Sequence, residues 1–354
     1  MTRKVLFSLA LSSSLVLAAC GGGSDSDDST AGGGAAAGCE DVTLRLSHQW
    51  PEPTGEDGDF RSQIAIDFKE KIEEATDGSV SVDIFPNSTL SRATEQYDAM
   101  LAGSIDMSVF PLDYASGLVP EWGITLMPGL VSNHDQAQAW EDAEIGDWVV
   151  ENMEENGLVL LTWVWNAGGI GTKADQPIVT PDDMPSGTTM RAAGTYVEHM
   201  LADAGAGISS LPSNEIYTAM QTGVLDAAVT STGSFASFNL QEQVAAYTSP
   251  TENTFWFMFE PLVITTETFE SLCEEQQEAV VAAGEDLQEF AYQASRDDDA
   301  RVEQLFTDAG VNVVTMDDAA YQEWVTLAEK QWADYAESIE GGQDLIDMAL
   351  EAGN

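Results

Sequence analysis

Strand and helix patterns alternate between residues 42 and 109, and this alternation constrains the fold more than any other feature of the sequence. The predicted elements, in order, are a strand at 42–46, a helix at 60–72, a strand at 80–84, a helix at 92–102 and a strand at 105–109. Asp59 stands directly before the first helix, where a short acidic side chain caps free backbone N–H groups. The order strand-helix-strand-helix-strand is typical of a parallel α/β sheet.

The rest of the chain continues the alternation, and we find no internal repeat. Further strands are predicted at 158–165, 188–192, 208–211, 227–230, 255–265 and 311–314. Predicted helices occupy 134–156, 196–204, 214–222 and 274–308, and more follow up to residue 352. We interpret this pattern as two α/β lobes, with the chain crossing between them more than once.

The N-terminus has the features of an export signal. Arg3 and Lys4 precede an apolar run that is too short to cross a bilayer, which needs about 20 apolar residues. The run ends in Leu-Ala-Ala-Cys at Cys20, which resembles a bacterial lipidation motif. We therefore predict a signal peptide at 1–19, a lipid on Cys20 and a flexible tether at 20–39, rich in Gly, Ala, Ser and Asp. An ordinary signal peptide with a chance cysteine is the alternative.

Charge excludes one class of partner. The chain has 61 acidic and 12 basic residues, a formal net charge of -49, and the acid is spread along its whole length. Nucleic acid binding is excluded, because phosphate contacts need a basic face. So acidic a surface suits concentrated salt, which screens self-repulsion. We therefore expect adaptation to salt.

Two cysteines remain besides Cys20: Cys39, at the end of the tether, and Cys273. An exported protein reaches an oxidising compartment, which permits a disulfide between them. Two separate buried thiols are an equally good interpretation of the sequence.

Aromatic and amide side chains follow the predicted strands, where open α/β sheets bind ligands. The residues that we assign to a small-molecule pocket on this basis are Gln49, Trp50, Asp113, Trp165, Asn166, Thr230, Phe235 and Phe238. Each of the four aromatic side chains could equally belong to the core. Trp163 and Trp165 are expected to share one strand face, with Trp165 nearer the strand end.

Three motifs resemble the solute-binding receptors of tripartite ATP-independent periplasmic (TRAP) transporters, of the dicarboxylate-receptor (DctP) type. The first is the run EQYDAMLAGSIDM at 95–107, and the second is Met-Pro-Gly-Leu at 127–130, with Gly129 in the family's aromatic position. The third and most specific joins Met190-Arg191 to 215–226, which is similar to the family's Glu-x-Tyr-x-Ala-Leu-Gln-x-Gly-x-x-Asp. The resemblance extends from about residue 42 onward.

The resemblance implies a two-lobed periplasmic-binding-protein-like fold with a hinge and a long connecting helix. We assign lobe I to 40–167 plus about 250–296, and lobe II to 168–249 plus about 297–354. It also implies a small organic acid as ligand, membrane subunits as partners and no chemistry by the receptor. Arg191 then holds the ligand carboxylate, as a planar guanidinium can by two parallel hydrogen bonds. Pairing of Arg191 with a local acid such as Glu198 is the alternative.

Two departures from the family bear on the ligand. Thr230 stands where many relatives have a carboxylate-binding asparagine, and Ile170 stands where many acid-binding relatives have a second arginine. We therefore expect a monocarboxylate with an apolar or hydroxylated body. Tyr217 and Asp226 belong to the third motif, in which their roles are either ligand binding or structural.

Other functions find less support. The sequence has no Gly-x-Ser-x-Gly, His-Glu-x-x-His, P-loop or Gly-x-Gly-x-x-Gly motif, so we expect neither an enzyme nor a cofactor. Its three histidines, His48, His134 and His199, are scattered, and we expect no metal site. His48 follows the first strand and either faces the ligand or lies on the surface. A receptor that feeds a sensor kinase or chemoreceptor, and a surface lipoprotein without a ligand, remain alternatives.

Overall fold

The computed structural model describes residues 39–53 and 58–352. The signal peptide predicted at 1–19, the lipid site Cys20 and all of the predicted tether except Cys39 lie outside these residues. From Cys39 onward the chain forms one unit built on two β-sheets.

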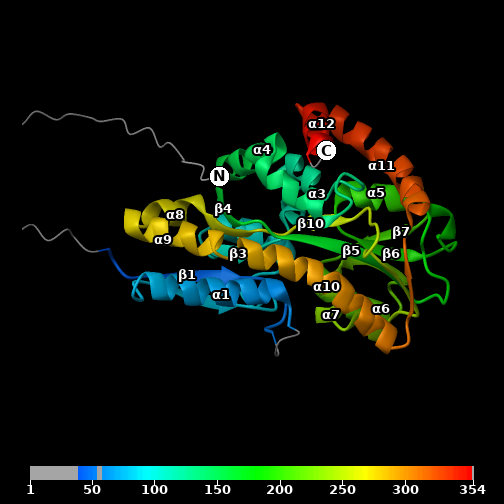
Figure 1. Ribbon diagram of the computed structural model, residues 1–354, viewed down its shortest axis with the longest axis horizontal. Helices are drawn as coiled ribbons and strands as arrows, with labels where there is room; N and C mark the ends of the chain where they lie inside the picture. Colours follow the sequence, from blue (N-terminus) through cyan, green and yellow to red (C-terminus); the bar gives the residue numbers. More distant parts are fainter. Residues whose placement is uncertain (1–38, 54–57, 353–354) are drawn as a thin grey trace, which may run out of the picture. The chain divides into compact units, whose positions relative to one another are not determined.

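The first sheet has the strand order β2-β1-β3-β11-β4, and Figure 1 labels β1, β3 and β4 of this sheet. Its strands are β1 (Val42–Ser47), β2 (Val80–Phe85), β3 (Met107–Val109), β4 (Leu158–Thr162) and β11 (Leu262–Thr265). β1 pairs in parallel with both β2 and β3, so the α/β arrangement predicted from residues 42–109 is confirmed. The predicted cap is also confirmed, because the Asp59 side chain accepts from the backbone N–H of Arg61 at the start of α1 (Phe60–Ala75).

The second sheet has the order β12-β9-β5-β8-β6-β7, and β10 pairs with β5 outside this path. Its strands are β5 (Trp165–Thr172), β6 (Thr189–Ala192), β7 (Gly207–Ser210), β8 (Ala227–Ser231), β9 (Ala246–Ser249), β10 (Phe257–Phe259) and β12 (Asn312–Thr315). Each sheet has an apolar cluster of its own, and a further cluster joins the two, with Leu158 and Val263 from the first sheet and Trp165 and Phe257 from the second. Leu44 and Phe68 belong to a cluster of the first sheet, and Met190 and Trp256 belong to one of the second.

Two predicted strands are wrong, because each is a pair of strands in different sheets. The run predicted at 158–165 divides into β4 and β5, and the run at 255–265 divides into β10 and β11. Both runs are buried almost throughout and show no period, so even the polar residues at the divisions, Thr162 and Glu260, are buried and do not indicate turns. Antiparallel pairing of β5 with β10 at Trp165–Ala167, and with β8 and β9 further along, places the crossing between the sheets here.

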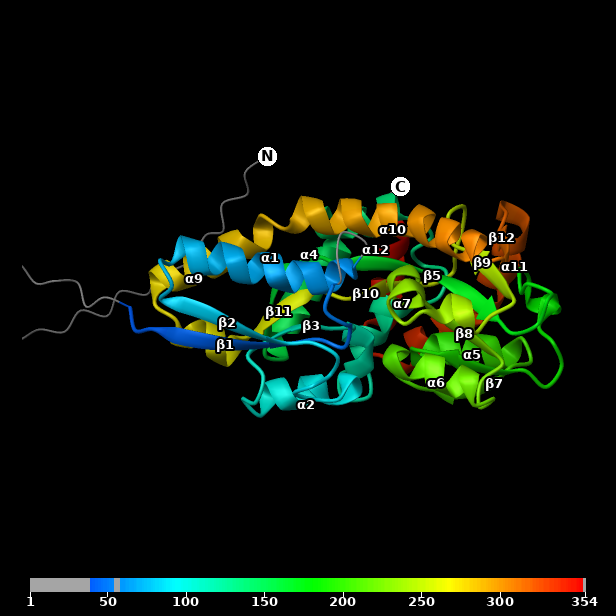
Figure 2. The same cartoon turned by 90° about the horizontal axis from the view of Figure 1, so that it is seen from below.

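Helices cover both sheets. Besides α1 they are α2 (Gln96–Leu101), α3 (His134–Ala139), α4 (Glu144–Glu155), α5 (Thr195–Asp203), α6 (Ile216–Gln221), α7 (Thr232–Ser237), α8 (Thr266–Ser271), α9 (Glu274–Glu285), α10 (Gln288–Asp308), α11 (Asp318–Ser338) and α12 (Gly342–Glu351). Figure 2 shows α10 running past α1 and on toward α7, and both helices contact it. The sequence patterns did not predict α7, α8 or β9.

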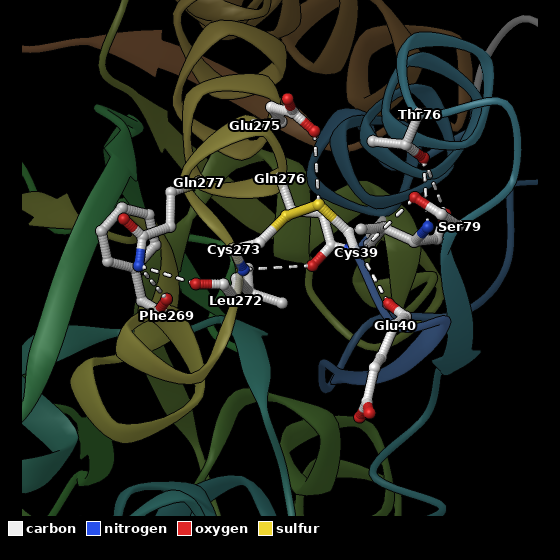
Figure 3. Close-up of a disulfide and its surroundings, with 11 residues drawn as sticks. Cys39, Glu40, Thr76, Ser79, Phe269, Leu272, Cys273, Glu275, Gln276 and Gln277 are labelled. Atoms are coloured by element: carbon white, nitrogen blue, oxygen red, sulfur yellow. Dashed lines mark hydrogen bonds between the residues drawn. A yellow bond between two sulfur atoms is a disulfide. The ribbon is translucent and has the colours of Figure 1, made fainter. Parts of the chain in front are cut away.

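A disulfide joins Cys39 to Cys273, the residue before α9, with the two Cα atoms 5.8 Å apart (Figure 3). Gln276 supports the link from the first turn of α9, because its side-chain amide donates to the carbonyl of Glu40 over 2.9 Å. The start of the described chain is therefore fastened to a helix 234 residues later in the sequence. The disulfide that the sequence permitted is therefore confirmed, and the alternative of two separate buried thiols is wrong.

No helix in the ranges 39–53 and 58–352 combines the length and the apolar character needed to cross a membrane.

Candidate functional site

Arg191 lies in β6 of the second sheet, and only 1% of its surface is exposed. Its Nε donates to the carbonyl of Leu211 over 2.8 Å, and Nη1 donates to the carbonyl of Val229 over 2.8 Å. Nη2 donates to the hydroxyl of Tyr114 over 3.0 Å. Tyr114 follows β3 of the first sheet, so the guanidinium lies where the two sheets approach each other.

The guanidinium of Arg191 is only partly satisfied. An arginine has five N–H donors, and three of those of Arg191 find acceptors, none of them a carboxylate. One N–H on each of Nη1 and Nη2 is left, which is the number that a two-point carboxylate contact requires. No ion pair within the described part of the chain includes Arg191. The alternative partner Glu198 instead accepts from the hydroxyl of Ser210 over 2.5 Å, so that interpretation is wrong.

A cavity of about 250 Å³ lies next to two of the groups that Arg191 contacts, although Arg191 itself is not among its lining residues. Its walls include Tyr114 and Leu211, both of which accept hydrogen bonds from Arg191. Residues near both sheets line it: Thr94, Asp113, Tyr114 and Ser116 come from the first, and Ala192–Thr195, Glu198, Ser210 and Leu211 come from the second. The volume suits a small molecule of a few heavy atoms.

Asp113 brings a buried carboxyl group to the same cavity. Burial and the neighbouring charge of Glu198 raise the pKa of Asp113 to about 7, although a hydrogen bond to Ser116 and the charge of Arg191 act in the other direction. Gly194, which also lines the cavity, has φ +88°, and a Cβ there would lie 3.3 Å from Asp113 Oδ2 and 2.8 Å from Leu126 Cδ2. Glycine at this position therefore permits the close approach.

Gln49 and Trp50 follow β1 and are both buried. The side-chain oxygen of Gln49 accepts from the Ser213 hydroxyl over 3.2 Å, and the Ser213 backbone N–H donates to Tyr114 over 3.2 Å. Gln49, Tyr114 and Arg191 therefore belong to one hydrogen-bonded group. His48 is buried rather than on the surface; its Nδ1 has no partner, and burial lowers its pKa to about 4.

Trp165 and Asn166 begin β5. Trp163 and Trp165 do not share a strand, because Trp163 lies in the connection between β4 and β5. The ring of Trp165 packs between Trp140 and Phe259, at 5.1 and 4.9 Å between centroids. Asn166 donates to Glu260 over 3.2 Å, which binds it into a different polar network from that of Arg191.

The remaining predicted residues divide into three groups. Thr230 lies in β8, directly after Val229, whose carbonyl accepts from Arg191. Phe235 is fully buried, with its ring against Tyr247 and Phe306, as expected of a core residue. Tyr217 and Phe238 line a separate hollow of about 310 Å³, where the hydroxyl of Tyr217 donates to Glu242. The structure does not bring these last three side chains to the cavity beside Arg191.

Arg61 is a second buried arginine that the sequence reasoning missed. It is fully buried in the first turn of α1, and its Nη2 and Nη1 contact Asp59 at 2.6 Å and Glu260 at 2.7 Å. Burial disfavours the charge, but the two carboxylates outweigh this and raise the pKa of Arg61. Burial also raises the pKa of Glu260 despite its contact with Arg61. The pair Asp59-x-Arg61 at a helix start was the available signal, although it also describes an ordinary surface cap.

Comparison with protein families gives one match over most of the chain. The model of the bacterial extracellular solute-binding protein family 7 (DctP) matches residues 54–338. A solute-binding protein of Albidiferax ferrireducens is 39% identical over 316 residues, which are 89% of this chain and 93% of that protein.

Solved structures give the same result. A TRAP periplasmic solute-binding protein of Rhodoferax ferrireducens with bound malonate is 38% identical, with a TM-score of 0.84 over 87% of this chain and 98% of that one. A second, from Sulfitobacter with bound β-D-galacturonate, is 25% identical, with a TM-score of 0.78 over 88% and 100% of the two chains. The two-lobed α/β fold with its long helix, expected from the resemblance, is confirmed.

Proposed function

Because this chain belongs to the bacterial extracellular solute-binding protein family 7, we propose that it captures a small organic acid between its lobes and delivers it to TRAP transporter membrane subunits. The observation that carries this proposal is Arg191, a buried guanidinium with two N–H donors left over, whose acceptors Tyr114 and Leu211 line a cavity of about 250 Å³. A buried cation needs a partner, and a ligand carboxylate supplies the missing charge. The solved relatives with bound malonate and galacturonate support a carboxylate as the ligand.

The ligand is a monocarboxylate with a hydroxylated or apolar body. Arg191 is the guanidinium beside the cavity, and the buried Arg61 is already neutralised by Asp59 and Glu260. Ile170, where many relatives have a second arginine, is buried and apolar. Asp113 and Glu198 on the cavity wall would repel a second carboxylate but accept a hydrogen bond from a hydroxyl group. One carboxylate therefore fits this site better than two.

The lobes that close on the ligand are 40–167 plus about 250–296, and 168–249 plus about 297–354. Crossings between the sheets at β4–β5 and β10–β11, together with α10, support a hinge at these points. The protein acts outside the cytoplasm, anchored by a lipid on Cys20. The tether predicted at 20–39 would keep the lobes near the membrane subunits and so raise their effective concentration there.

A screen of small acids by thermal unfolding tests the ligand class. A ligand that binds only the folded protein stabilises it by about 2.7 kcal/mol at 100 times its Kd, or roughly 5 °C for a chain of this size. We expect one or more monocarboxylates to give such a shift, and their dicarboxylate analogues to give less. Failure of every monocarboxylate to raise Tm would refute the ligand class. Delivery is tested by uptake of the identified acid in cells with and without the receptor.

A further inference from the structure

Three serines lie at every third position through α7, and together they form one face of this short helix. Ser231 precedes the helix, Ser234 lies within it, and Ser237 is its last residue. Residues three apart share a helix face. We refer to Ser231, Ser234 and Ser237 as the serine face. It belongs to the second sheet, and the family's ligand motif does not include it.

The serine face meets polar groups of the first sheet. Arg61 Nη1 donates to the Ser231 hydroxyl over 2.9 Å, and Nη2 donates to the Ser234 hydroxyl over 3.4 Å. The indole N–H of Trp50 donates to Ser234 over 3.3 Å, and Ser237 donates to Asp59 over 2.5 Å. Arg61 also lies over the Trp50 ring, 4.0 Å from its centroid. Four hydrogen bonds therefore cross from one sheet to the other at this point.

Arg61 has no spare donor. Its five N–H groups make three hydrogen bonds to Asp59 and Glu260 and two to the serine face. This differs from Arg191, which keeps two donors free. Separation of the sheets here would exchange two hydrogen bonds of a charged group for bonds to water, and hydrogen bonds to charged groups are net favourable in the folded state.

Gly233 sets how close α7 comes to Arg61. A Cβ at this position would lie 2.7 Å from Arg61 Nη2 and 3.0 Å from Asp298 Oδ2. Asp59 and Glu260 hold the guanidinium, so it cannot easily move away. Glycine weakens a helix relative to alanine, and the backbone of Gly233 is not left-handed. Close contact with Arg61 is therefore the physical reason for glycine here.

We propose that Arg61 and the serine face form a latch that holds the lobes closed and sets the closed fraction of the receptor. This inference rests on the lobe closure proposed above. The latch shares β8 with the ligand site: the Val229 carbonyl accepts from Arg191, and two residues later the Ser231 hydroxyl accepts from Arg61. Arg61 and the serine face are positioning residues, because they act on ligand affinity through closure.

The test removes the serine hydroxyls but leaves the ion pairs of Arg61 intact. In Ser231→Ala/Ser234→Ala, Arg61 keeps Asp59 and Glu260, so the fold is not put at risk. Gly233→Ala adds a methyl group that obstructs closure. Ser249→Ala is the matched control, because Ser249 is equally buried and bonds only to Thr251 and Glu303.

Spin labels on Leu118→Cys and Val224→Cys report the separation of the lobes, in protein with Cys20→Ser and an intact disulfide. These are the two most exposed large apolar side chains in the described ranges, at 61% and 56%. The double serine variant and Gly233→Ala should shift the distance distribution toward the open form, with and without acid. We expect Kd for the best acid from the screen to rise about tenfold, or about 1.4 kcal/mol. Ser249→Ala should change Kd less than twofold.

Unchanged distances and Kd in both variants would overturn the latch. A single lobe separation in the unmodified protein, with and without acid, would also overturn it, because closure would then be absent. Failure of all acids to bind the unmodified protein counts against the proposed function instead. In that case the distance distributions without ligand still decide whether the latch exists.

Discussion

Replacing Arg191 by lysine tests the ligand site most directly. It keeps the positive charge but removes the planar guanidinium, which can hold a carboxylate by two parallel hydrogen bonds. Lysine has three donors on one nitrogen, whereas the guanidinium already gives three N–H groups to Leu211, Val229 and Tyr114 and holds two more free. The ammonium group therefore cannot donate to these three acceptors and also form two hydrogen bonds to a ligand carboxylate.

The expected loss follows from the bonds that disappear. A hydrogen bond to a charged group contributes about 1.5–3 kcal/mol, and the Arg191→Lys variant forfeits one of the two to the ligand. Kd should therefore rise roughly 10- to 100-fold. Arg191→Ala removes the charge as well and should weaken binding further. Both variants also lose internal hydrogen bonds, so affinity must be measured well below their Tm.

Isothermal titration with the best acid from the screen, and with its uncharged amide, gives the result. In the unmodified protein, the amide should bind much more weakly than the acid. In Arg191→Ala, the acid and the amide should bind with similar, low affinity, because the contact between the guanidinium and the carboxylate is already absent. Arg45→Lys is the control. Arg45 donates two hydrogen bonds to the carboxylate of Asp106 in the first sheet, so this variant loses a two-point contact of the same kind at a position away from the ligand site. Unaltered affinity in Arg191→Ala would refute the assignment.

Three further predictions concern stability. Reduction of Cys39–Cys273 should lower the free energy of unfolding by roughly 3–5 kcal/mol, because the link closes a very long loop, and a Tm scan with and without reductant checks this. Asp113→Asn should stabilise the ligand-free protein at pH 8 and leave it unchanged at pH 4. The pKa of Asp113 in the folded protein, about 7, lies above the ordinary value of 3.8, so the unmodified protein loses stability as the pH rises from about 4 to about 7. The same change in the free energy of urea unfolding at pH 4 and pH 8 would contradict this. With a net charge of -49, Tm should rise as NaCl is added, and a Tm independent of salt would argue against salt adaptation.

Periodicity in the sequence was enough to predict most of the elements and the parallel core of the first sheet. It placed β1, α1 and β2 within a few residues, because each has a more buried and a more exposed face, which leave a period of two or 3.6; β3 was placed as well, although all three of its residues are buried. The same reasoning failed at the β4–β5 and β10–β11 crossings, where strands are buried on both faces and show no period. It also missed α7, whose sequence Thr-Gly-Ser-Phe-Ala-Ser has no apolar repeat.

Arg191 was found from its motif and from the cost of burying an arginine, and Asp113, Gln49 and Trp50 from their places after strands. Sequence position alone determined these candidates, since the ends of parallel strands meet at one edge of a sheet. Only the tertiary structure decided which groups meet. It gave Arg191 no acid partner, placed Phe235 in the core, and set Arg61 against serines 170 or more residues away. Such contacts depend on how two sheets approach each other, and no local pattern in the chain records that distance.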